Sequence, residues 1–179
     1  MVEMVVMLAI ITAVSATVLV GFGPARESGA LGRSARELAL AIRRAQNMSL
    51  AVTQIDTSAG PKIPAAVGLY IERGRETYFL FADLARDDKY DAADVKIADQ
   101  DPAFEGGARI KSLVYYGDAG ERRTLPSAHI VFAAPEAAMK VSDANGNGLG
   151  EVLEIELVSR SGQLAKTITV RTSGQVSIK

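Results

Sequence analysis

The chain has 179 residues, a net charge of −1 and 48% hydrophobic residues. The length fits one compact domain with an additional element. A charge near zero argues against a general polyanion binder, because nonspecific affinity for nucleic acid comes from many phosphate contacts. The chain has no Cys and one His, His129, which excludes disulfides, Cys metal sites and clusters of His ligands.

The first segment, residues 2–20, is almost continuously apolar and is interrupted by Glu3 and a few small hydroxyl residues. About 20 apolar residues in a helix span roughly 30 Å, the thickness of a hydrocarbon core. A cleaved signal peptide would have a basic start and a shorter apolar stretch. A plain signal anchor would normally carry flanking positive charge, whereas the first cation here is Arg26. We therefore predict that residues 1–23 form a helix for a membrane or for the core of a filament.

Residues 21–24 are Gly-Phe-Gly-Pro, a combination that predicts a kink or break in the helix. Helical character returns in the segment 24–52, because apolar residues recur there at steps of three and four. This stripe consists of Leu31, Ala35, Leu38, Ile42, Ala45 and Met48. The segment is amphipathic, so we expect it to lie against a folded domain.

Residues 53–179 read as a globular β-rich domain. Residues 152–158 alternate between apolar and acidic side chains, which is typical of a half-buried strand. Two hairpins are predicted, one around residues 73–76 and one around 172–174. The predicted strands are 67–72, 77–82, 109–116, 129–133, 138–141, 152–158, 165–171 and 175–178. The expected fold is α+β, with a long N-terminal helix, kinked near Gly21 and Pro24, packed on an antiparallel β-sheet domain.

Three stretches carry a resemblance to a known family. Residues 1–11 read MVEMVVMLAII, a hydrophobic run with one Glu near its start, and this run resembles the N-terminus of type IV pilins. Residues 34–51 resemble the helix of the GspH/FimT-type minor pilins and pseudopilins. Residues 167–178, two strands joined by Ser-Gly, resemble the C-terminus of that group. In the family the Glu is the fifth residue of the mature protein, after a short basic leader, and here it is the third. The site of processing and of N-methylation is therefore left open.

The resemblance implies a structural subunit of a type IV pilus or of a type II secretion-like pseudopilus, and not an enzyme. It implies other pilin or pseudopilin subunits, the pilus assembly machinery and the inner membrane as partners. The implied localisation is a single pass of the cytoplasmic membrane with the domain outside, followed by an extracellular or periplasmic filament. The residues that the resemblance assigns to assembly are Glu3, Val5, Leu8, Ile11 and Pro24.

Two interpretations of Glu3 remain open. In a filament of packed helices its carboxylate could meet the cationic N-terminal amine of a neighbouring subunit and set the axial register. Alternatively, Glu3 is an interfacial residue at the helix start, where the helix dipole favours an acid. The cost of an isolated carboxylate in lipid, at least a few kcal/mol, makes a specific role worth testing.

A second pattern concerns calcium, which prefers several oxygen ligands. The sequence from Asp143 matches a calcium loop, which has acids or amides at the first, third and fifth places, Gly at the sixth and Glu at the twelfth. The candidate ligands are Asp143, Asn145, Asn147, Glu151 and Glu154. However, no amphipathic helix precedes Asp143, and Glu154 falls inside a predicted strand. The alternative is a turn rich in Asn and Gly whose side chains cap their own backbone.

A further acidic loop follows the strand that ends near Phe81. Its candidate ligands are Asp83, Asp87 and Asp91, and Asp88 and Asp94 belong to the same stretch. Close carboxylates repel one another unless they are solvated or bridged by a cation. The loop therefore predicts either a solvated surface or a second calcium site, and calcium is the one cofactor that these patterns suggest.

No catalytic constellation is present in the sequence. His129 alternates with Ile130 and Phe132, which indicates a residue of a sheet rather than a catalytic base. One alternative function is a filament-associated minor pilin that binds DNA for uptake. It rests on the C-terminal cations Arg160, Lys166, Arg171 and Lys179, which are few for a nucleic-acid interface.

Overall fold

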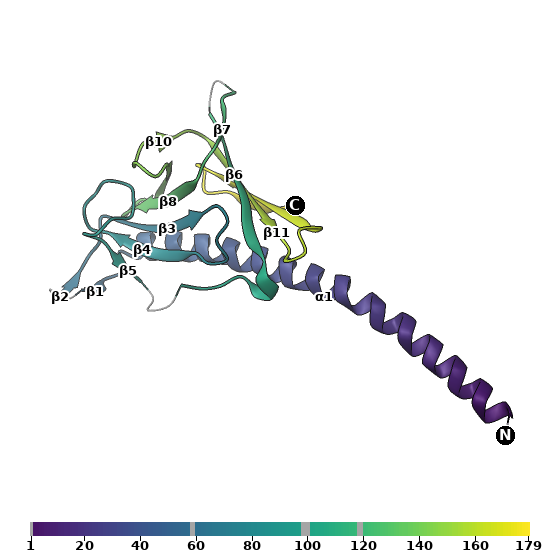
Figure 1. Cartoon of the computed structure of the whole chain (residues 1–179). Coiled ribbons are helices and arrows are strands. Elements are labelled where there is room, and N and C mark those ends of the chain that lie inside the picture. Colours follow the sequence, from purple (N-terminus) through teal and green to yellow (C-terminus); the bar gives the residue numbers. More distant parts are fainter. Residues whose placement is uncertain (1, 58–59, 98–100, 118–119) are drawn as a thin grey trace.

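The computed structural model describes residues 2–57, 60–97, 101–117 and 120–179, without the side chains of 17–22. A single helix, α1 (Val2–Leu50), comes first, and strands follow it to the end of the chain (Figure 1). The strands are β1 (Ile55–Thr57), β2 (Gly60–Lys62), β3 (Ala66–Glu72), β4 (Phe79–Asp83), β5 (Val95–Lys96), β6 (Arg109–Tyr116), β7 (Arg122–Thr124), β8 (Ser127–Ala133), β9 (Ala138–Ser142), β10 (Gly148–Leu149), β11 (Val152–Val158), β12 (Ala165–Arg171) and β13 (Val176–Ile178). A 3-10 turn, η1 (Glu105–Gly107), precedes β6.

The strands form three sheets. One has six strands in the order β10-β9-β8-β3-β4-β5, one has five in the order β13-β12-β11-β6-β7, and β1 pairs with β2 alone. Neighbouring strands are antiparallel throughout the described pairs. The predicted alternation of 152–158 is confirmed, because Leu153, Ile155 and Leu157 of β11 are fully buried. Glu154 and Glu156, on the other face, remain partly exposed.

The core lies where the second half of α1 meets both larger sheets. Five residues of the predicted stripe, Leu31, Ala35, Leu38, Ile42 and Ala45, are at most 2% exposed. They belong to one apolar cluster with Leu69 and Ile130 of the six-stranded sheet and with Ile155 and Ile168 of the five-stranded sheet. Helix α1 accordingly contacts β3 and β8 as well as β11, β12 and β13.

The predicted arrangement, a long kinked N-terminal helix packed on one antiparallel sheet, is wrong. The β region is divided into three sheets, and the buried stripe of α1 contacts two of them. The structure describes the helix with side chains over 2–16 and 23–50, and Pro24 lies inside α1 rather than at a break in it. All described side chains of 2–16 are exposed, and this part of α1 projects away from the sheets (Figure 1). The reason is that both larger sheets have an apolar face to cover, and one stripe with small Ala residues lets both approach it.

The predicted cytoplasmic-membrane anchor is also wrong. Among the residues that the structure describes, no helix is both long enough and apolar enough to cross a membrane.

Candidate functional site

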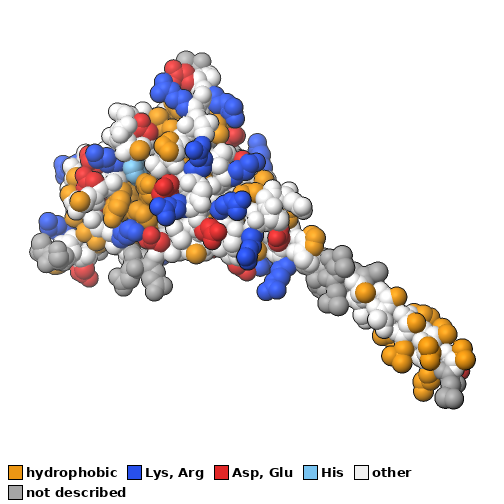
Figure 2. Space-filling model, in the orientation of Figure 1, with side chains coloured by type: hydrophobic (Ala, Val, Ile, Leu, Met, Phe, Trp, Pro, Cys, Tyr) orange, Lys and Arg blue, Asp and Glu red, His pale blue; other side chains and the backbone are white. Residues whose placement is uncertain are grey.

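Among the described residues, exposed large hydrophobic side chains concentrate on the N-terminal part of α1. Figure 2 shows hydrophobic side chains gathered on the projecting end of the helix, whereas charged side chains are spread over the domain. Its large hydrophobic residues are each more than half exposed, namely Val2, Met4, Val5, Val6, Met7, Leu8, Ile10, Ile11 and Val14. We call residues 2–16 the apolar segment. An exposed apolar surface of this extent is typical of an interaction site.

The structure places four of the five predicted assembly residues together on the apolar segment. Val5, Leu8 and Ile11 are 67%, 64% and 62% exposed, and Glu3 lies in the first turn of α1. An acid at this position interacts favourably with the helix dipole, as the interfacial interpretation of Glu3 predicts. The fifth residue, Pro24, is exposed and lies further along the same helix.

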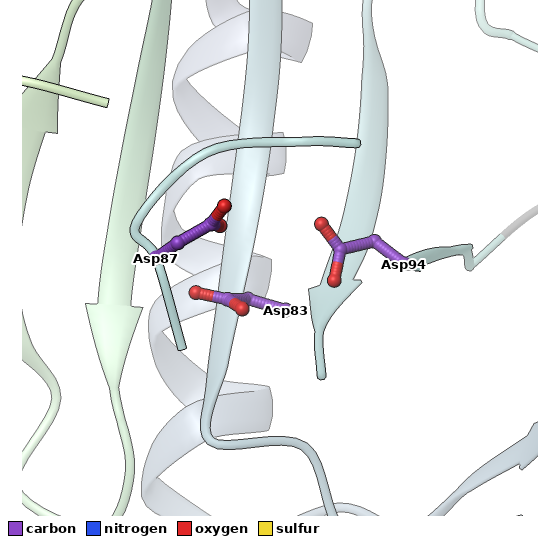
Figure 3. A group of neighbouring side chains, drawn as sticks. All are labelled: Asp83, Asp87 and Asp94. Carbon is purple, nitrogen blue, oxygen red and sulfur yellow. The ribbon is translucent and has the colours of Figure 1, made fainter. Parts of the chain in front are cut away.

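A second candidate site is a group of three carboxylates at the end of β4. One oxygen from each of Asp83, Asp87 and Asp94 lies within 4.8 Å of the others, and the three side chains turn toward one another (Figure 3). In the described part of the chain, this is the one such group of three or more His, Cys, Asp or Glu residues. The sequence predicted Asp83 and Asp87 here, but Asp94 takes the place that was assigned to Asp91.

Backbone N–H groups satisfy the two most buried of these carboxylates. Asp83 is fully buried, and its oxygens accept hydrogen bonds from the backbone N–H groups of Arg86 (2.6 Å) and Asp88 (3.1 Å). Asp94 is 9% exposed and accepts from the N–H groups of Leu84 (2.8 Å) and Asp91 (3.0 Å). The carboxylates therefore hold the loop between β4 and β5 in shape.

Asp87 and Asp91 are placed differently. Asp87 forms an ion pair with the ammonium of Lys89 at 3.3 Å. Asp91 accepts a hydrogen bond from the backbone N–H of Ala93 at 2.7 Å, within its own turn. Asp91 thus shapes the turn that presents Asp94, and sequence spacing alone could not distinguish the two acids.

Burial raises the pKa of the Asp83 carboxyl, and the negative charges of Asp94 and Asp87 raise it further, against the lowering effect of the two N–H donors. A carboxyl with a raised pKa in the folded state holds its proton more strongly there than in the unfolded chain. The free energy of unfolding therefore decreases as the pH rises from the ordinary pKa of an Asp carboxyl through the raised pKa of folded Asp83. A cation among the three carboxylates would offset this cost. The arrangement is thus compatible with calcium, and the calcium prediction for this loop stays a prediction.

The loop that carries the carboxylates covers an aromatic cluster on the outer face of the six-stranded sheet. Phe81 is fully buried there, and the ring of Tyr90 from the loop packs edge-on against Phe79 and Phe81 at centroid distances of 4.8 and 5.5 Å. His129 of β8 joins this cluster with its ring 5.0 Å from that of Tyr70. This covering explains why β3 is buried on both faces although it belongs to an antiparallel sheet.

His129 is a buried residue of β8. It is 2% exposed, and its Nδ1 lies 3.2 Å from the backbone carbonyl oxygen of Asp143. Because a carbonyl can only accept, Nδ1 carries the proton. Burial lowers the pKa of the imidazole, against the raising effect of the Asp143 carbonyl and of the nearby carboxylates of Asp87 and Asp143.

We expect the stability of the chain to fall with acidification in a window that begins near pH 6.5 and ends at the lower pKa of folded His129. In this window the unfolded imidazole binds a proton that the folded one does not, so the free energy of unfolding decreases as the pH falls. Nuclear magnetic resonance of the one imidazole in the chain measures the pKa directly, and urea unfolding measures the slope. In His129→Phe this slope should disappear. Protonation of Asp83 increases the free energy of unfolding as the pH falls, in the unchanged chain and in the variant alike. An unchanged slope in His129→Phe would therefore contradict the assignment of the slope to His129.

The predicted calcium loop at Asp143 folds as a capped turn between β9 and β10. One oxygen of Asp143 accepts from the backbone N–H groups of Asn145 (2.8 Å) and Asn147 (3.0 Å), and the other accepts from the Asn147 side chain (3.1 Å). Burial opposes ionisation of Asp143, but these donors outweigh it and lower its pKa. The side chains thus cap their own backbone, as the alternative interpretation predicts.

The two Glu residues of the predicted ligand set lie just before β11 and on it. Glu154 lies on β11, where its carboxylate accepts from the Tyr116 hydroxyl at 3.0 Å. Glu151 is exposed, and among the described residues no group of three or more His, Cys, Asp or Glu within ligand distance of one another includes Asp143. The calcium prediction for this loop therefore stays a prediction.

Comparison of the chain with known protein families, with curated proteins and with solved structures returns no match. Functional assignment therefore depends on the two features described above. The apolar segment is exposed, whereas the buried carboxylates of Asp83 and Asp94 already have hydrogen-bond donors.

Proposed function

We propose that this chain is a structural subunit that assembles with other subunits into a filament through the apolar segment of α1. Its particular kind would be a GspH/FimT-type minor pilin or pseudopilin, a subunit of a type IV pilus or of a type II secretion-like pseudopilus. The resemblance of residues 1–11, 34–51 and 167–178 to that group supports the second statement. Other subunits of the same kind and an assembly machinery would then be its partners.

One observation carries the proposal, the exposed apolar surface of residues 2–14 on a helix that projects from the domain. Burying apolar surface contributes about 25 cal/mol per Å², or about 1.5–3 kcal/mol for a Val, Leu, Ile or Met side chain that becomes fully buried. Full burial of the nine large hydrophobic residues in a bundle of helices would contribute roughly 14–27 kcal/mol. This contribution is at least as large as most of the range for the entropic cost of association, about 4–15 kcal/mol.

The rest of α1 suits this role because the domain holds it firmly. Leu31, Leu38 and Ile42 anchor the helix in the main core, and Ser49 donates a hydrogen bond to the carbonyl oxygen of Phe132 at 2.8 Å. The guanidinium of Arg33 pairs with the carboxylate of Glu105 through two hydrogen bonds, one of them 2.8 Å long. A helix fixed in this way presents the apolar segment at a defined direction from the domain.

The full chain should form filaments in dilute buffer, and the variant Leu8→Lys with Ile11→Lys should remain monomeric. The two Lys side chains would place unpaired charge in the interface, while the domain, which these residues do not support, should unfold at the same temperature as before. Sedimentation velocity and electron microscopy measure assembly, and circular dichroism measures the unfolding temperature.

The matched control is Ile63→Lys, because Ile63 is 61% exposed, close to the 62% of Ile11, but lies on the domain. This variant should assemble as the unchanged chain does. A full chain that stays monomeric at high concentration would overturn the proposal. Filaments of the double Lys variant would overturn the role of the apolar segment.

A further inference from the structure

A shallow groove lies between the exposed face of α1 and the edge strand β13. It has a volume of about 350 Å³ and is lined by Arg36, Ala39, Leu40, Arg43, Val176 and Ile178. We call it the α1–β13 groove. A second hollow of about 450 Å³ continues from it along α1 and shares Leu40 and Arg43 with it.

The floor of this groove is apolar, and its charged walls are cationic. Leu40 is 64% exposed and Ile178 is 39% exposed, although both are large hydrophobic residues. Arg36 and Arg43 are exposed, and neither takes part in an ion pair among the described residues. An occupant of matching chemistry would be apolar and would carry an acid.

We propose that the α1–β13 groove binds the apolar segment of a second copy of this chain, with Glu3 of that copy beside Arg36. This inference rests on the proposed function and names the surface that covers the apolar segment. Glu3 is the one charged side chain of residues 2–16. Covering the segment removes water from this carboxylate, which is costly unless the covering surface supplies a cation.

The spacing of the two helix faces agrees with this pairing. Glu3, Met7 and Ile10 follow one another at steps of four and three, and so do Arg36, Leu40 and Arg43, so each set lies on one face of a helix. When the two helices run parallel, Glu3 meets Arg36, Met7 meets Leu40, and Ile10 meets the aliphatic stem of Arg43. This contact joins two different surfaces of the chain, and repeating such a head-to-tail contact builds an open filament when the rotation does not close a ring. The axial offset between the two copies is 33 residues along α1, about 50 Å at 1.5 Å per residue.

A larger hollow on the domain fits the apolar segment less well. It has a volume of about 730 Å³ and is lined in part by Ile63, Asp83, Arg86, Asp88 and Lys140. Lys140 is already paired with Asp88 at 2.7 Å, and Asp83 adds a further carboxylate. In that hollow the cations Arg86 and Lys140 lie among the carboxylates of Asp83 and Asp88, whereas the lining of the α1–β13 groove has two arginines and no carboxylate.

Disulfide trapping tests the pairing cleanly because the chain has no Cys of its own. One copy carries Met7→Cys, the other carries Leu40→Cys, and the mixture is assembled and oxidised. A disulfide forms only where the Cβ atoms come within about 4.5 Å, so the proposal predicts a covalent dimer between these two copies. The matched control replaces Leu40→Cys by Ile63→Cys and should yield several-fold less dimer. Ile63 is 61% exposed, close to the 64% of Leu40, but lies in the other hollow.

The outcomes separate this inference from the proposed function. Filaments in which two copies of Met7→Cys are joined by a disulfide, but Met7→Cys and Leu40→Cys are not, would overturn the groove and leave the filament proposal in place. The absence of any assembly would overturn both. Trapping with Ile63→Cys in place of Leu40→Cys would assign the apolar segment to the other hollow and overturn the groove.

A charge exchange tests the Glu3–Arg36 contact. Arg36→Glu should raise the protein concentration needed for assembly about tenfold or more, as expected when a close charge pair becomes a repulsive one. Combining it with Glu3→Arg should restore assembly. Arg122→Glu on β7 removes the same charge outside the groove and should have no such effect. Binding of a short DNA duplex that Arg36→Glu abolishes, without a change in assembly, would identify nucleic acid as the occupant and overturn the proposal.

Discussion

Replacing Leu38 with Ala should lower the free energy of unfolding by about 2–5 kcal/mol, the range for a Leu removed from a packed core. Leu38 is fully buried at the centre of the α1 stripe, in a cluster that includes residues of both larger sheets. The cavity would therefore loosen two helix–sheet contacts together. Urea unfolding measures the effect, in a chain that also carries Leu8→Lys and Ile11→Lys so that assembly does not add to the stability.

The matched control is Leu40→Ala, two residues further along the same helix. Leu40 is 64% exposed, so its replacement removes the same atoms from a surface and should change the free energy of unfolding by less than about 0.5 kcal/mol. The gain in helix propensity from Leu to Ala is the same at both positions and cancels in the comparison. Equal effects of the two substitutions would show that the stripe does not carry the core.

Replacing Gly68 with Ala should cost about 1–3 kcal/mol, the usual cost of an extra methyl group in a packed interior. Gly68 of β3 lies directly opposite Phe81 of β4 in the sheet. A Cβ at Gly68 would lie 2.4 Å from Cζ and 2.5 Å from Cε1 of the Phe81 ring. Phe81 is fully buried, and Tyr90 packs on it, so the ring cannot swing away without disturbing the aromatic cluster.

A double-mutant cycle checks this cause. In a Phe81→Leu background the ring is absent, and Gly68→Ala should cost less by about 0.5–3 kcal/mol, the coupling typical of residues in contact. Gly148→Ala serves as the control, because a Cβ there meets no atom within 4 Å. If Gly68→Ala cost the same in both backgrounds, the effect would come from the backbone of β3 and not from the ring.

The strands show how far local pattern reaches. Residues 109–116, 152–158 and 165–171 were predicted with the bounds that the structure has for β6, β11 and β12. The strands that the sequence analysis missed, β1, β2, β5, β7 and β10, have two or three residues each. A period of two needs about four residues to be visible, so strands this short are determined by their partners.

The acidic loops show where local pattern fails. The spacing from Asp143 to Glu154 matches a calcium loop, but the structure uses Asp143 to cap a turn and Glu154 to accept from Tyr116. In the other loop the run of acids was visible, yet Asp94 rather than Asp91 joins Asp83 and Asp87. Which carboxylates converge depends on how the chain folds back over the aromatic cluster, and this is a long-range property.

By itself, the sequence determined the apolar segment, the stripe on the second half of α1, and most of the longer strands, because helix and strand periodicity are local. Only the tertiary structure decided that the strands divide into three sheets and that one helix stripe covers two of them. The tertiary structure also decided that Leu40, an apolar residue outside the predicted stripe, lies exposed in a groove between two arginines. Sheet pairing and the covering of a surface join residues that are far apart along the chain, so no local pattern can specify them.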